Sequence, residues 1–538
     1  MDDREPPPET LKELLEASCA RYRSRPAFTS MGSTLRYGEI DRLSAAFGAF
    51  LRRGLGLEPG ERVALMLPNL LQYPVALAAA LRAGLAVVNV NPLYTAPEVQ
   101  FQLADSGAAA VVVLENFAHT LAQALAGTRV RHIITTQVGD LYPAPKRWAT
   151  NFAVKRARHM VPAFRLPAAV PWRAALSHRF DLPETLVQAE DIAFLQYTGG
   201  TTGRPKGAVL THGNLAANVR QTVAWIGGAL ERGGETVVTA LPLYHIFALT
   251  ANLLVFMSLG GRNLLVADPR DMGSFIRELS RTPFSAITGV NTLYAALLGE
   301  PGFAALEFSG LKLAIAGGMA VSRAVAERWQ RLTGVPLIEG YGLTEASPIV
   351  CVNPADAREF SGKLGLPLPG TEVAIRDERG AELARGEIGE ICVRGPQVMR
   401  GYWNAPEETA QAFFPGGWLR TGDLGRMDAR GAVEFVERRK DVIVVSGFKA
   451  YPSEIEQVAL LHPGVKDAGA VGIPHRKSGE AVALFVVKRD PALTAAALAE
   501  HCALRLAPYK RPARIEFRDS LPKSPLGKVL HRELQARA

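Results

Sequence analysis

The sequence predicts an α/β protein. We expect a large N-terminal domain of doubly wound sheets with helices and a β-rich portion, followed by a small α+β C-terminal domain. Apolar runs alternate with helical patterns over residues 35–115 and again after residue 235, as in doubly wound folds. The composition then changes after about Arg438, where shorter strand and helix patterns begin. We therefore place the N-terminal domain at residues 1–438 and the C-terminal domain at residues 439–538.

Most expected strands are short apolar runs, and the helices between them follow from periodicity and capping signals. Thr95 and Glu98 have capping-box spacing and open a helix that Gly107 closes. The expected strands of the large domain are 63–67, 86–90, 110–114, 192–195, 208–210, 236–240, 264–267, 286–290 and 311–316. The small domain is expected to contain strands at 442–445 and 483–487 and helices at 453–461 and 495–506.

Composition excludes several classes of protein. The chain has 538 residues, of which 48% are hydrophobic and 21% are charged, as in globular proteins with a large core. Its four cysteines lie far apart with no CxxC pattern, which argues against a zinc site or a disulfide framework and fits a reducing compartment. The proline-rich start has no apolar segment of a secretory signal. The apolar stretch 63–81 contains two prolines, so a buried strand and helix explain it better than a membrane span.

A basic segment stands out at residues 145–180. The net charge of the chain is +9, and this segment interleaves lysines and arginines with tryptophan, phenylalanine and methionine. Such a segment can lie on an anionic bilayer surface. The alternative is a solvated, positively charged connection across the domain.

A loop rich in glycine and threonine covers residues 197–207 and reads YTGGTTGRPKG. Glycines let backbone N–H groups converge, threonine hydroxyls donate further hydrogen bonds, and Lys206 supplies positive charge, so the loop suits an anion. It is not a Walker A motif, because glycine follows Lys206 where serine or threonine would be needed. Taken alone, such a loop is also compatible with an ordinary surface hairpin.

Four later motifs strengthen the phosphate interpretation. Segment 339–345 (EGYGLTE) carries an aromatic ring and a carboxylate, and segment 417–425 (GWLRTGDLG) places Asp423 in a turn. Segment 437–441 (ERRKD) is a charge cluster at the composition change, and segment 522–528 (PKSPLGK) presents a lysine on a tight turn. Each motif alone is weak, whereas all five in this order are specific.

Together these motifs resemble the adenylate-forming superfamily of acyl-CoA synthetases, luciferases and peptide-synthetase adenylation domains, nearly from end to end. The subgroup that the chain resembles most is the bacterial long-chain fatty-acid CoA ligases, through segments 241–247, 396–403, 417–425 and 445–456 and the doubled glycine at 199–200. Two positions depart from the pattern. Ala316 stands where a third glycine is common, and Glu437 stands where aspartate is usual.

The resemblance implies an ATP-dependent ligase that forms acyl-AMP and pyrophosphate from a fatty acid, then acyl-CoA and AMP. Lys528 would reach the acid and the α-phosphate, Glu345 and Thr198 would hold Mg²⁺, and His245 would lie near the acyl carboxylate. A packed surface histidine is the alternative for His245. The implied ATP-contacting residues are Thr198, Gly199, Gly200, Thr201, Thr202, Gly203, Lys206, Gly318, Glu339, Gly340, Tyr341, Gly342, Thr344, Asp423 and Arg438.

The resemblance also implies a mobile C-terminal domain that brings in Lys528 for the first step and removes it for the second. Lys440 occupies the hinge position, and Ser446, Gly447 and Phe448 would line the tunnel for the pantetheine arm of CoA. Expected partners are a fatty acid, ATP and CoA, with a homodimer also considered. The expected location is the cytoplasm, with peripheral contact at the inner face of the cytoplasmic membrane through residues 145–180.

Other functions stay open at this point. A fatty-acyl-AMP ligase that loads a carrier protein often has an insertion before its C-terminal domain, and none is visible between Arg400 and Arg438. An aryl-acid CoA ligase would differ in substrate. A non-catalytic lipid-binding protein at a membrane surface would use the basic segment but would lack the ATP loop, Glu345 or Lys528. A nucleic-acid binder would need readout motifs, which are not visible.

Overall fold

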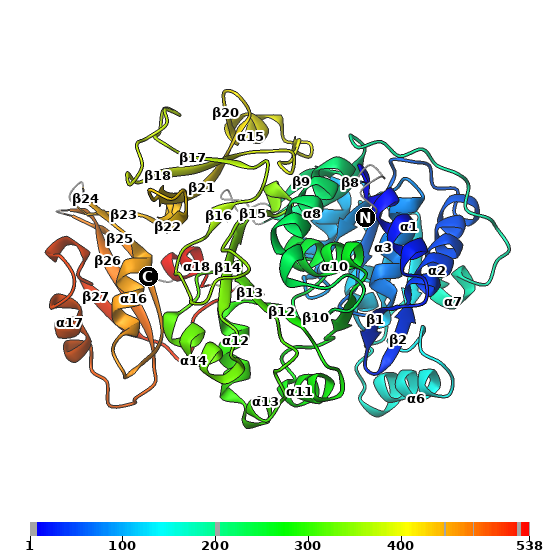
Figure 1. Cartoon of the computed structure of the whole chain (residues 1–538), viewed down its shortest axis with the longest axis horizontal. Coiled ribbons are helices and arrows are strands. Elements are labelled where there is room, and N and C mark those ends of the chain that lie inside the picture. Colours follow the sequence, from blue (N-terminus) through cyan, green and yellow to red (C-terminus); the bar gives the residue numbers. More distant parts are fainter. Residues whose placement is uncertain (1–7, 199–204, 446–447, 477, 524–528, 537–538) are drawn as a thin grey trace. The chain divides into compact units, whose positions relative to one another are not determined.

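The computed structural model describes residues 8–198, 205–445, 448–476, 478–523 and 529–536. It divides into two compact units (Figure 1). The first unit comprises Met1–Glu372 and Arg394–Phe413, and the second comprises Val373–Val393 and Phe414–Ala538. These units are defined by contacts within the structure. The domain boundary that the sequence predicts after Arg438 stays a prediction.

An eight-stranded sheet of the first unit contains the earliest predicted strands. Its inner strands are parallel and read as apolar runs, since a parallel sheet is covered on both faces. All five residues of β5 are buried, for example. In spatial order the sheet consists of β19 (Gly401–Tyr402), β9 (Lys206–Thr211), β8 (Ile192–Thr198), β4 (Ala86–Asn89), β3 (Arg62–Met66), β5 (Ala110–Leu114), β6 (His132–Thr136) and β7 (Val170–Pro171).

A nine-stranded sheet forms the other half of the first unit. Strands β11, β10, β12, β13 and β14 run parallel, and the sheet ends at both edges in antiparallel pairs. In spatial order the strands are β16 (Leu366–Pro367), β15 (Ile349–Val352), β14 (Leu337–Gly342), β13 (Leu313–Gly317), β12 (Ala286–Gly289), β10 (Thr236–Thr239), β11 (Arg262–Leu265), β1 (Pro26–Ser30) and β2 (Ser33–Arg36).

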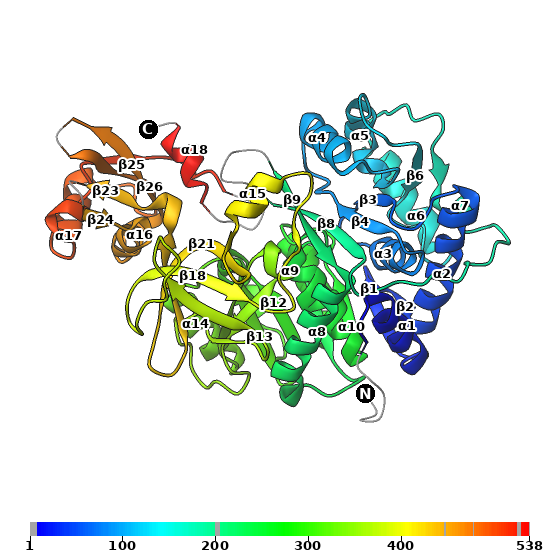
Figure 2. The ribbon, with the colours of Figure 1, turned by 90° about the horizontal axis from the view of Figure 1, so that it is seen from above.

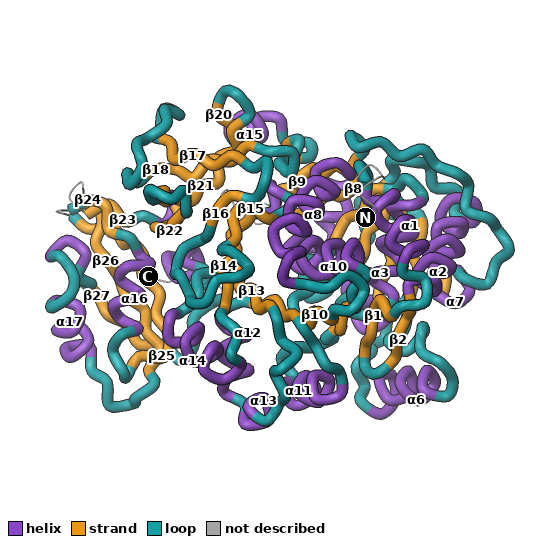
Figure 3. Tube along the Cα trace, viewed as in Figure 1, coloured by secondary structure: helices purple, strands orange, loops and turns teal. Residues whose placement is uncertain are grey.

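Helices pack between the two sheets as well as outside them (Figures 2 and 3). Helix α2 contacts the nine-stranded sheet, α3 contacts the eight-stranded sheet, and the two helices pack on each other. In the same way, α10 contacts the nine-stranded sheet, α8 contacts the eight-stranded sheet, and α10 packs on α8. The helices of the first unit are α1 (Leu11–Arg21), α2 (Tyr37–Ala49), α3 (Gln72–Arg82), α4 (Ala96–Ser106), α5 (Ala118–Ala124), α6 (Lys146–Phe152), α7 (Trp172–Ala175), α8 (His212–Ile226), α9 (Ile246–Ala248), α10 (Val255–Leu259), α11 (Met272–Arg281), α12 (Asn291–Gly299), α13 (Pro301–Ala304), α14 (Arg323–Thr333) and α15 (Pro406–Gln411).

The local signals for helix α4 are confirmed. The backbone N–H of Thr95 donates to Glu98 at 2.7 Å, which completes the capping box. Gly107 ends the helix with φ of 61°, a conformation that glycine adopts without a Cβ penalty. The apolar stretch 63–81, for which we expected a buried strand and helix instead of a membrane span, contains the buried strand β3 followed by the buried helix α3. None of the described helices combines the length and apolar character that crossing a bilayer requires.

The second unit holds two smaller sheets. One has β17 (Glu372–Arg376), β18 (Gly389–Arg394), β21 (Trp418–Met427) and β20 (Phe413–Phe414), with β22 (Val433–Arg438) paired to β21. The other has β24 (Phe448–Ala450), β23 (Ile443–Val445), β26 (Gly479–Lys488) and β25 (Val465–His475), with β27 (Arg514–Phe517) paired to β26. Its helices are α16 (Pro452–Leu460), α17 (Ala495–Ala503) and α18 (His531–Gln535). These elements confirm the predicted α+β character of the C-terminal part.

Candidate functional site

The predicted anion-binding loop connects two neighbouring antiparallel strands. Thr198 ends β8 and Lys206 begins β9, and the two residues lie opposite each other in the strand register. The loop therefore leaves and re-enters the sheet at one point. Residues 199–204, which include the predicted Gly199, Gly200, Thr201, Thr202 and Gly203, lie outside the described residues.

Tyr402 contacts both Lys206 and Glu345. The sequence analysis included this residue only as part of segment 396–403. The ammonium of Lys206 lies 5.2 Å from the ring centroid of Tyr402, a cation–π distance. The hydroxyl of Tyr402 donates to Oε1 of Glu345 at 2.8 Å. Burial, with the nearby Glu345 charge, raises the pKa of Tyr402 far above its ordinary value, so the phenol stays protonated and remains a donor. One aromatic side chain thus contacts both a positive and a negative side chain.

Strand β19 brings Tyr402 into this position. Gly401 and Tyr402 pair with Val209 and Ala208 of β9, and the N–H of Trp403 donates to the carbonyl of Gly207 at 2.7 Å. A Cβ atom at position 207 would lie 3.2 Å from the Tyr197 ring. A side chain here would force the Tyr197 ring to shift by a few tenths of an ångström, so close packing favours the glycine that excluded a Walker A motif.

The EGYGLTE segment forms the end of β14 and the turn after it. Glu345 belongs to a short 3₁₀ helix, Thr344–Ala346, and its backbone carbonyl accepts from Met399 at 2.7 Å. A Cβ atom at Gly342 would lie 2.1 Å from the carbonyl oxygen of Pro348, so no other residue fits without movement. The half-buried Tyr341 pairs with Cys351 in the sheet.

Glu339 is the most perturbed carboxylate of this segment. Its Oε1 accepts from the N–H of Val321 at 3.2 Å, while Oε2 is buried with no hydrogen-bond partner in the described part of the chain. Burial raises the pKa of Glu339 to about 7. Its neighbour in the sheet is the end of β13, where Gly317 pairs with Gly340 and Gly318 has φ of 75°.

A buried polar network holds the turn that carries His245. The amide of Asn69 donates to the carbonyls of Thr239 and Leu241, and the Tyr73 hydroxyl donates to the carbonyl of Leu243 at 2.8 Å. Gln196 of β8 donates to the carbonyl of Tyr244 at 2.9 Å. Because buried polar groups are costly unless paired, this network fixes the turn between the two sheets.

His245 caps helix α9. Its Nδ1 accepts from the N–H of Phe247 at 3.3 Å, and burial lowers the pKa of the imidazole to about 4. The ring is therefore neutral near pH 7. The Phe247 ring lies beside Gly317, where an added Cβ would be 3.1 Å away. The His245 turn thus reaches the carboxyl end of β13, the edge at which ligands bind in such sheets.

In the second unit, Asp423 and Arg438 lie opposite each other on β21 and β22, with Nε of Arg438 3.4 Å from Oδ1 of Asp423. Glu390, which sequence reasoning missed, supports this turn from β18. It accepts from the N–H of Gly422 at 3.1 Å and pairs with Arg420 at 3.0 Å and Arg439 at 3.1 Å. A buried acid near a glycine turn has no local sequence signal, since its partners come from other strands.

Glu437, which departs from the family pattern, has a structural role. Its Oε2 accepts from the N–H of Ser453 at 2.7 Å in the first turn of α16. Burial raises the pKa of Glu437 even though this N–H and that of Arg438 stabilise the charged form. The carboxylate therefore links β22 to α16 within the second unit.

Several other predicted residues are also in the second unit. Lys440 is exposed in a 3₁₀ turn, Arg439–Asp441, and Phe448 is 59% exposed and stacks on Tyr509 at 5.1 Å. Ser446, Gly447 and Lys528 lie outside the described residues. Lys523 and Val529 form an antiparallel bridge on either side of the segment that contains Lys528.

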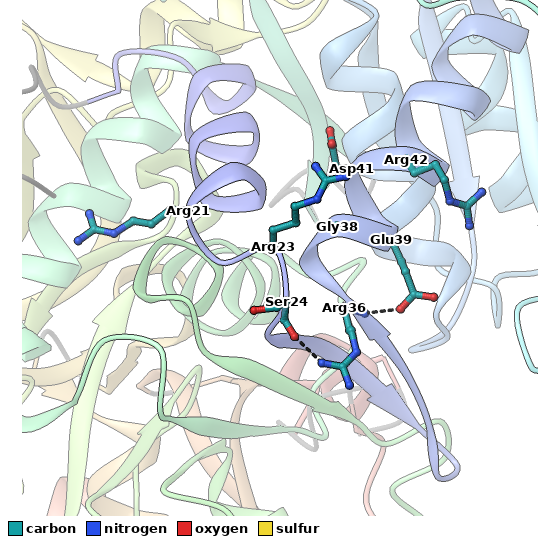
Figure 4. A pocket seen from close by; sticks show the side chains of 8 residues that line it. All are labelled: Arg21, Arg23, Ser24, Arg36, Gly38, Glu39, Asp41 and Arg42. Atoms are coloured by element: carbon teal, nitrogen blue, oxygen red, sulfur yellow. Dashed lines mark hydrogen bonds between the residues drawn. The ribbon is translucent and has the colours of Figure 1, made fainter.

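A pocket of about 880 Å³ lies elsewhere in the first unit, between the end of α1 and the start of α2 (Figure 4). Arg36 donates to the carbonyl of Ser24, and its N–H donates to Glu39 at 2.9 Å. None of the predicted site residues belongs to its lining, which is Arg21, Arg23, Ser24, Arg36, Gly38, Glu39, Asp41 and Arg42.

Comparison with known proteins decides the family. Residues 15–403 match the AMP-binding enzyme family, and residues 454–528 match the AMP-binding enzyme C-terminal domain. The chain belongs to the AMP-binding enzyme family. It is 53% identical over 532 residues to the long-chain-fatty-acid–CoA ligase of Salmonella typhimurium, covering 98% of this chain and 95% of that protein. The Bacillus subtilis protein of the same name is 37% identical, with 98% and 94% covered.

Solved structures agree with this membership. The ATP-bound MatB protein from Rhodopseudomonas palustris has a TM-score of 0.81 and 28% sequence identity, with 98% of each chain covered. The α/β fold class and the resemblance to adenylate-forming enzymes are therefore confirmed. Among the described residues, no group of three or more histidines, cysteines, aspartates and glutamates could hold a metal ion.

Proposed function

We propose that the chain is an ATP-dependent long-chain fatty-acid:CoA ligase. It forms acyl-AMP and pyrophosphate first, and acyl-CoA and AMP second. One observation carries this proposal: the chain is similar over nearly its full length to family members named long-chain-fatty-acid–CoA ligase, at 53% identity in one case. The local arrangement of Lys206, Tyr402 and Glu345 supports it, because a lysine can bind phosphate and a carboxylate can hold the Mg²⁺ that accompanies ATP.

The first step brings two anions together, the carboxylate of the acid and the α-phosphate of ATP. Two like unit charges at about 4 Å repel by roughly 4 kcal/mol at an effective dielectric of 20. Neutralising that repulsion is the main catalytic task. Lys206 and the loop at 198–206 would hold the β- and γ-phosphates, and Lys528 would reach the acid and the α-phosphate. The neutral imidazole of His245 adds no charge that would fix the acid in an unreactive ion pair.

Mg²⁺ is the metal that such a site would use. It keeps several waters and takes one or two protein oxygens besides phosphate, so a single carboxylate with a hydroxyl is an adequate donor set. Glu345 fits, since its carboxylate is oriented by the hydroxyl of Tyr402 at 2.8 Å, and the ring of the same tyrosine contacts Lys206. Thr198 is the proposed second donor. When bound, the ion would neutralise phosphate charge.

The remaining ATP contacts are proposed from the family resemblance. Tyr341 would stack on adenine, between backbone groups of Glu339, Gly340, Gly342, Thr344 and Gly318. Asp423 and Arg438 would bind the ribose hydroxyls. The Arg438 guanidinium, 3.4 Å away, holds the Asp423 side chain in place, and a carboxylate is a strong acceptor for a hydroxyl pair.

For the second step, we propose that the part of the chain after Arg438 moves as a domain about Lys440. Movement of Lys528 away from the acyl group would make room for the thiol of CoA. Ser446, Gly447 and Phe448 would then line the path of the pantetheine arm. We place the enzyme in the cytoplasm, consistent with four buried, unpaired cysteines, with peripheral contact at the inner face of the cytoplasmic membrane. A homodimer also stays a proposal.

An AMP-release assay with CoA, over acids from short to very long chain, tests the function. Release that rises with chain length and needs CoA for turnover is expected. Turnover with a carrier protein but not with CoA would replace the proposal by a fatty-acyl-AMP ligase, and a preference for aromatic acids would replace it by an aryl-acid ligase. No AMP release with any acid would favour a non-catalytic lipid-binding protein.

A second assay tests the role of Lys528. We expect Lys528→Ala to abolish acid-dependent ATP–pyrophosphate exchange while CoA still captures supplied acyl-adenylate. Lys466→Ala, an exposed lysine of the same unit, is the matched control and should keep both activities. Exchange near the wild-type rate in Lys528→Ala would show that the lysine has another role.

A further inference from the structure

The helix that begins at Lys146 has its apolar side chains on the solvent side. Helix α6 (Lys146–Phe152) continues directly into a π-helical turn, Ala153–Ala157, and no residue of either segment is buried. Trp148 is 63% exposed and Phe152 is 67% exposed. The two rings are four positions apart and therefore share one face of the helix. Surface helices ordinarily turn that face toward the core, so this arrangement is reversed.

Nearby groups extend this exposed face. Met160 follows the helix and is 51% exposed, and Met31 at the β1–β2 turn is 40% exposed. The ammonium of Lys146 donates to the Met31 carbonyl, so the start of the helix is attached to the tip of that hairpin (Figure 1). Trp148 and Phe152 thus lie on a helix that is attached to a hairpin of the sheet, and Met160 lies just after that helix. We call the side chains of Trp148, Phe152, Met160, Arg156 and Arg158 the α6 surface.

The charged residues of the chain segment that carries the α6 surface are all basic. Residues 141–180 contain eight lysines and arginines and no aspartate or glutamate. Lys155 pairs with Glu115 at 2.9 Å, but Arg156 and Arg158 are exposed and form no ion pair with a described carboxylate. The guanidinium of Arg147 lies 5.3 Å from the Trp148 ring centroid, which keeps a positive charge beside the apolar face.

We infer that the α6 surface docks the chain on an anionic phospholipid bilayer. Trp148 and Phe152 enter the boundary between headgroups and acyl chains, where the apolar faces of amphipathic helices insert their aromatic side chains. Arg156 and Arg158 contact lipid phosphates. A bilayer fits better than a protein partner because it offers apolar and anionic groups together over a flat area, and it needs no shaped pocket. This inference gives the proposed membrane contact a defined surface, and it does not depend on the ligase reaction.

Co-sedimentation with vesicles tests the inference without any substrate. The full chain is mixed with phosphatidylglycerol-rich vesicles or with pure phosphatidylcholine vesicles, at low and at high salt. Binding to the anionic vesicles only, weakened by salt, is expected. Each removed arginine charge should lower the partition coefficient about fivefold, so Arg156→Glu with Arg158→Glu should lower it at least about 25-fold. Trp148→Ser with Phe152→Ser should also lower it at least tenfold at unchanged net charge.

Matched controls separate the α6 surface from general effects. Arg489→Glu with Arg505→Glu makes the same change in net charge at two exposed arginines elsewhere, and Leu461→Ser with Leu504→Ser removes two exposed apolar side chains. Both controls should bind like the wild type, and thermal unfolding verifies that every variant is folded.

Three results would overturn the inference. The first is equal binding by wild type and both α6 variants, and the second is equal loss in the controls. The third is a change of oligomeric state in the α6 variants, measured by light scattering, which would make this face an interface between two copies of the chain.

Discussion

Replacing His531 should remove most of the pH dependence of stability in the C-terminal part of the chain. The Nε2 atom of His531 lies 2.6 Å from Oε1 of Glu456, and Nδ1 lies 3.3 Å from Oδ2 of Asp441. All three side chains are at most 17% exposed. Burial alone would lower the pKa of His531, but the two carboxylates outweigh it and raise the pKa to about 10. His531 is therefore a fixed cation that joins α18, α16 and the turn that ends at Asp441.

The sign of the effect follows from the raised pKa. The ordinary value for histidine is 6.5, so the stabilisation is fully present below about pH 6.5 and is lost as the pH rises through about 10. Each tenfold change in proton affinity between the unfolded and folded chain corresponds to about 1.4 kcal/mol, which gives an upper limit of roughly 5 kcal/mol. Breaking a buried ion pair by removing one partner costs about 3–5 kcal/mol, in the same range. We expect a loss of about 3 kcal/mol between pH 6 and pH 9.

Hydrogen–deuterium exchange can measure this loss locally, because a chain of two compact units does not unfold in one step. The opening free energy of peptides that cover α18 and α16 should fall with pH in the wild type. His531→Gln should show a low and nearly flat value, and His531→Arg should retain part of the stability. His501→Gln is the control, since His501 lies 2.9 Å from the carbonyl of Val458 and packs edge-on against His462, and it forms no ion pair with a described carboxylate. A wild-type slope in His531→Gln would refute the role of the ion pairs.

Three further substitutions test the remaining contacts. Tyr402→Phe removes the 2.8 Å hydrogen bond to Glu345 but keeps the ring, so ATP–pyrophosphate exchange should fall about tenfold or more, and unchanged exchange would contradict the coupling. Gly342→Ala places a Cβ 2.1 Å from a backbone oxygen and should destabilise the first unit by more than about 2 kcal/mol in thermal unfolding. Gly228→Ala, with open space around its Cβ, should unfold like the wild type. Shortening Glu437 to Asp should withdraw the acceptor from the first turn of α16 and speed amide exchange there, reflecting about 1 kcal/mol; unaltered exchange would show that the cap is dispensable.

Much of the fold could be predicted from local patterns. Strands β3, β4, β5, β10 and β12 lie where short apolar runs were found, and the Thr95–Glu98 capping box opens helix α4 as expected. These features are local, because a continuous apolar run, a cap and a terminal glycine act within a few residues. Strand order and the packing of helices between two sheets were not predictable in this way, since they depend on contacts between distant segments.

In the candidate site, too, some residues could be predicted from local patterns and others could not. The glycine and threonine loop, Glu345 and Asp423 could be selected because residue type and spacing signal an anion site and a turn. Tyr402 and Glu390 could not be assigned roles, because each acts on partners from segments that are distant in the sequence. Glu437 was noted only as a departure from a family pattern, and its contact with α16 explains why the longer side chain is useful.

The sequence by itself determined the class of the fold, the positions of most elements and the motif set of an adenylate-forming enzyme, because these follow from short-range periodicity and residue chemistry. Only the tertiary structure decided which groups meet. It brought Tyr402 into contact with both Lys206 and Glu345, enclosed His531 between two carboxylates, and turned Trp148 and Phe152 toward solvent. The physical reason is that charge pairing and burial depend on segments far apart in the chain, whose distances no local pattern specifies.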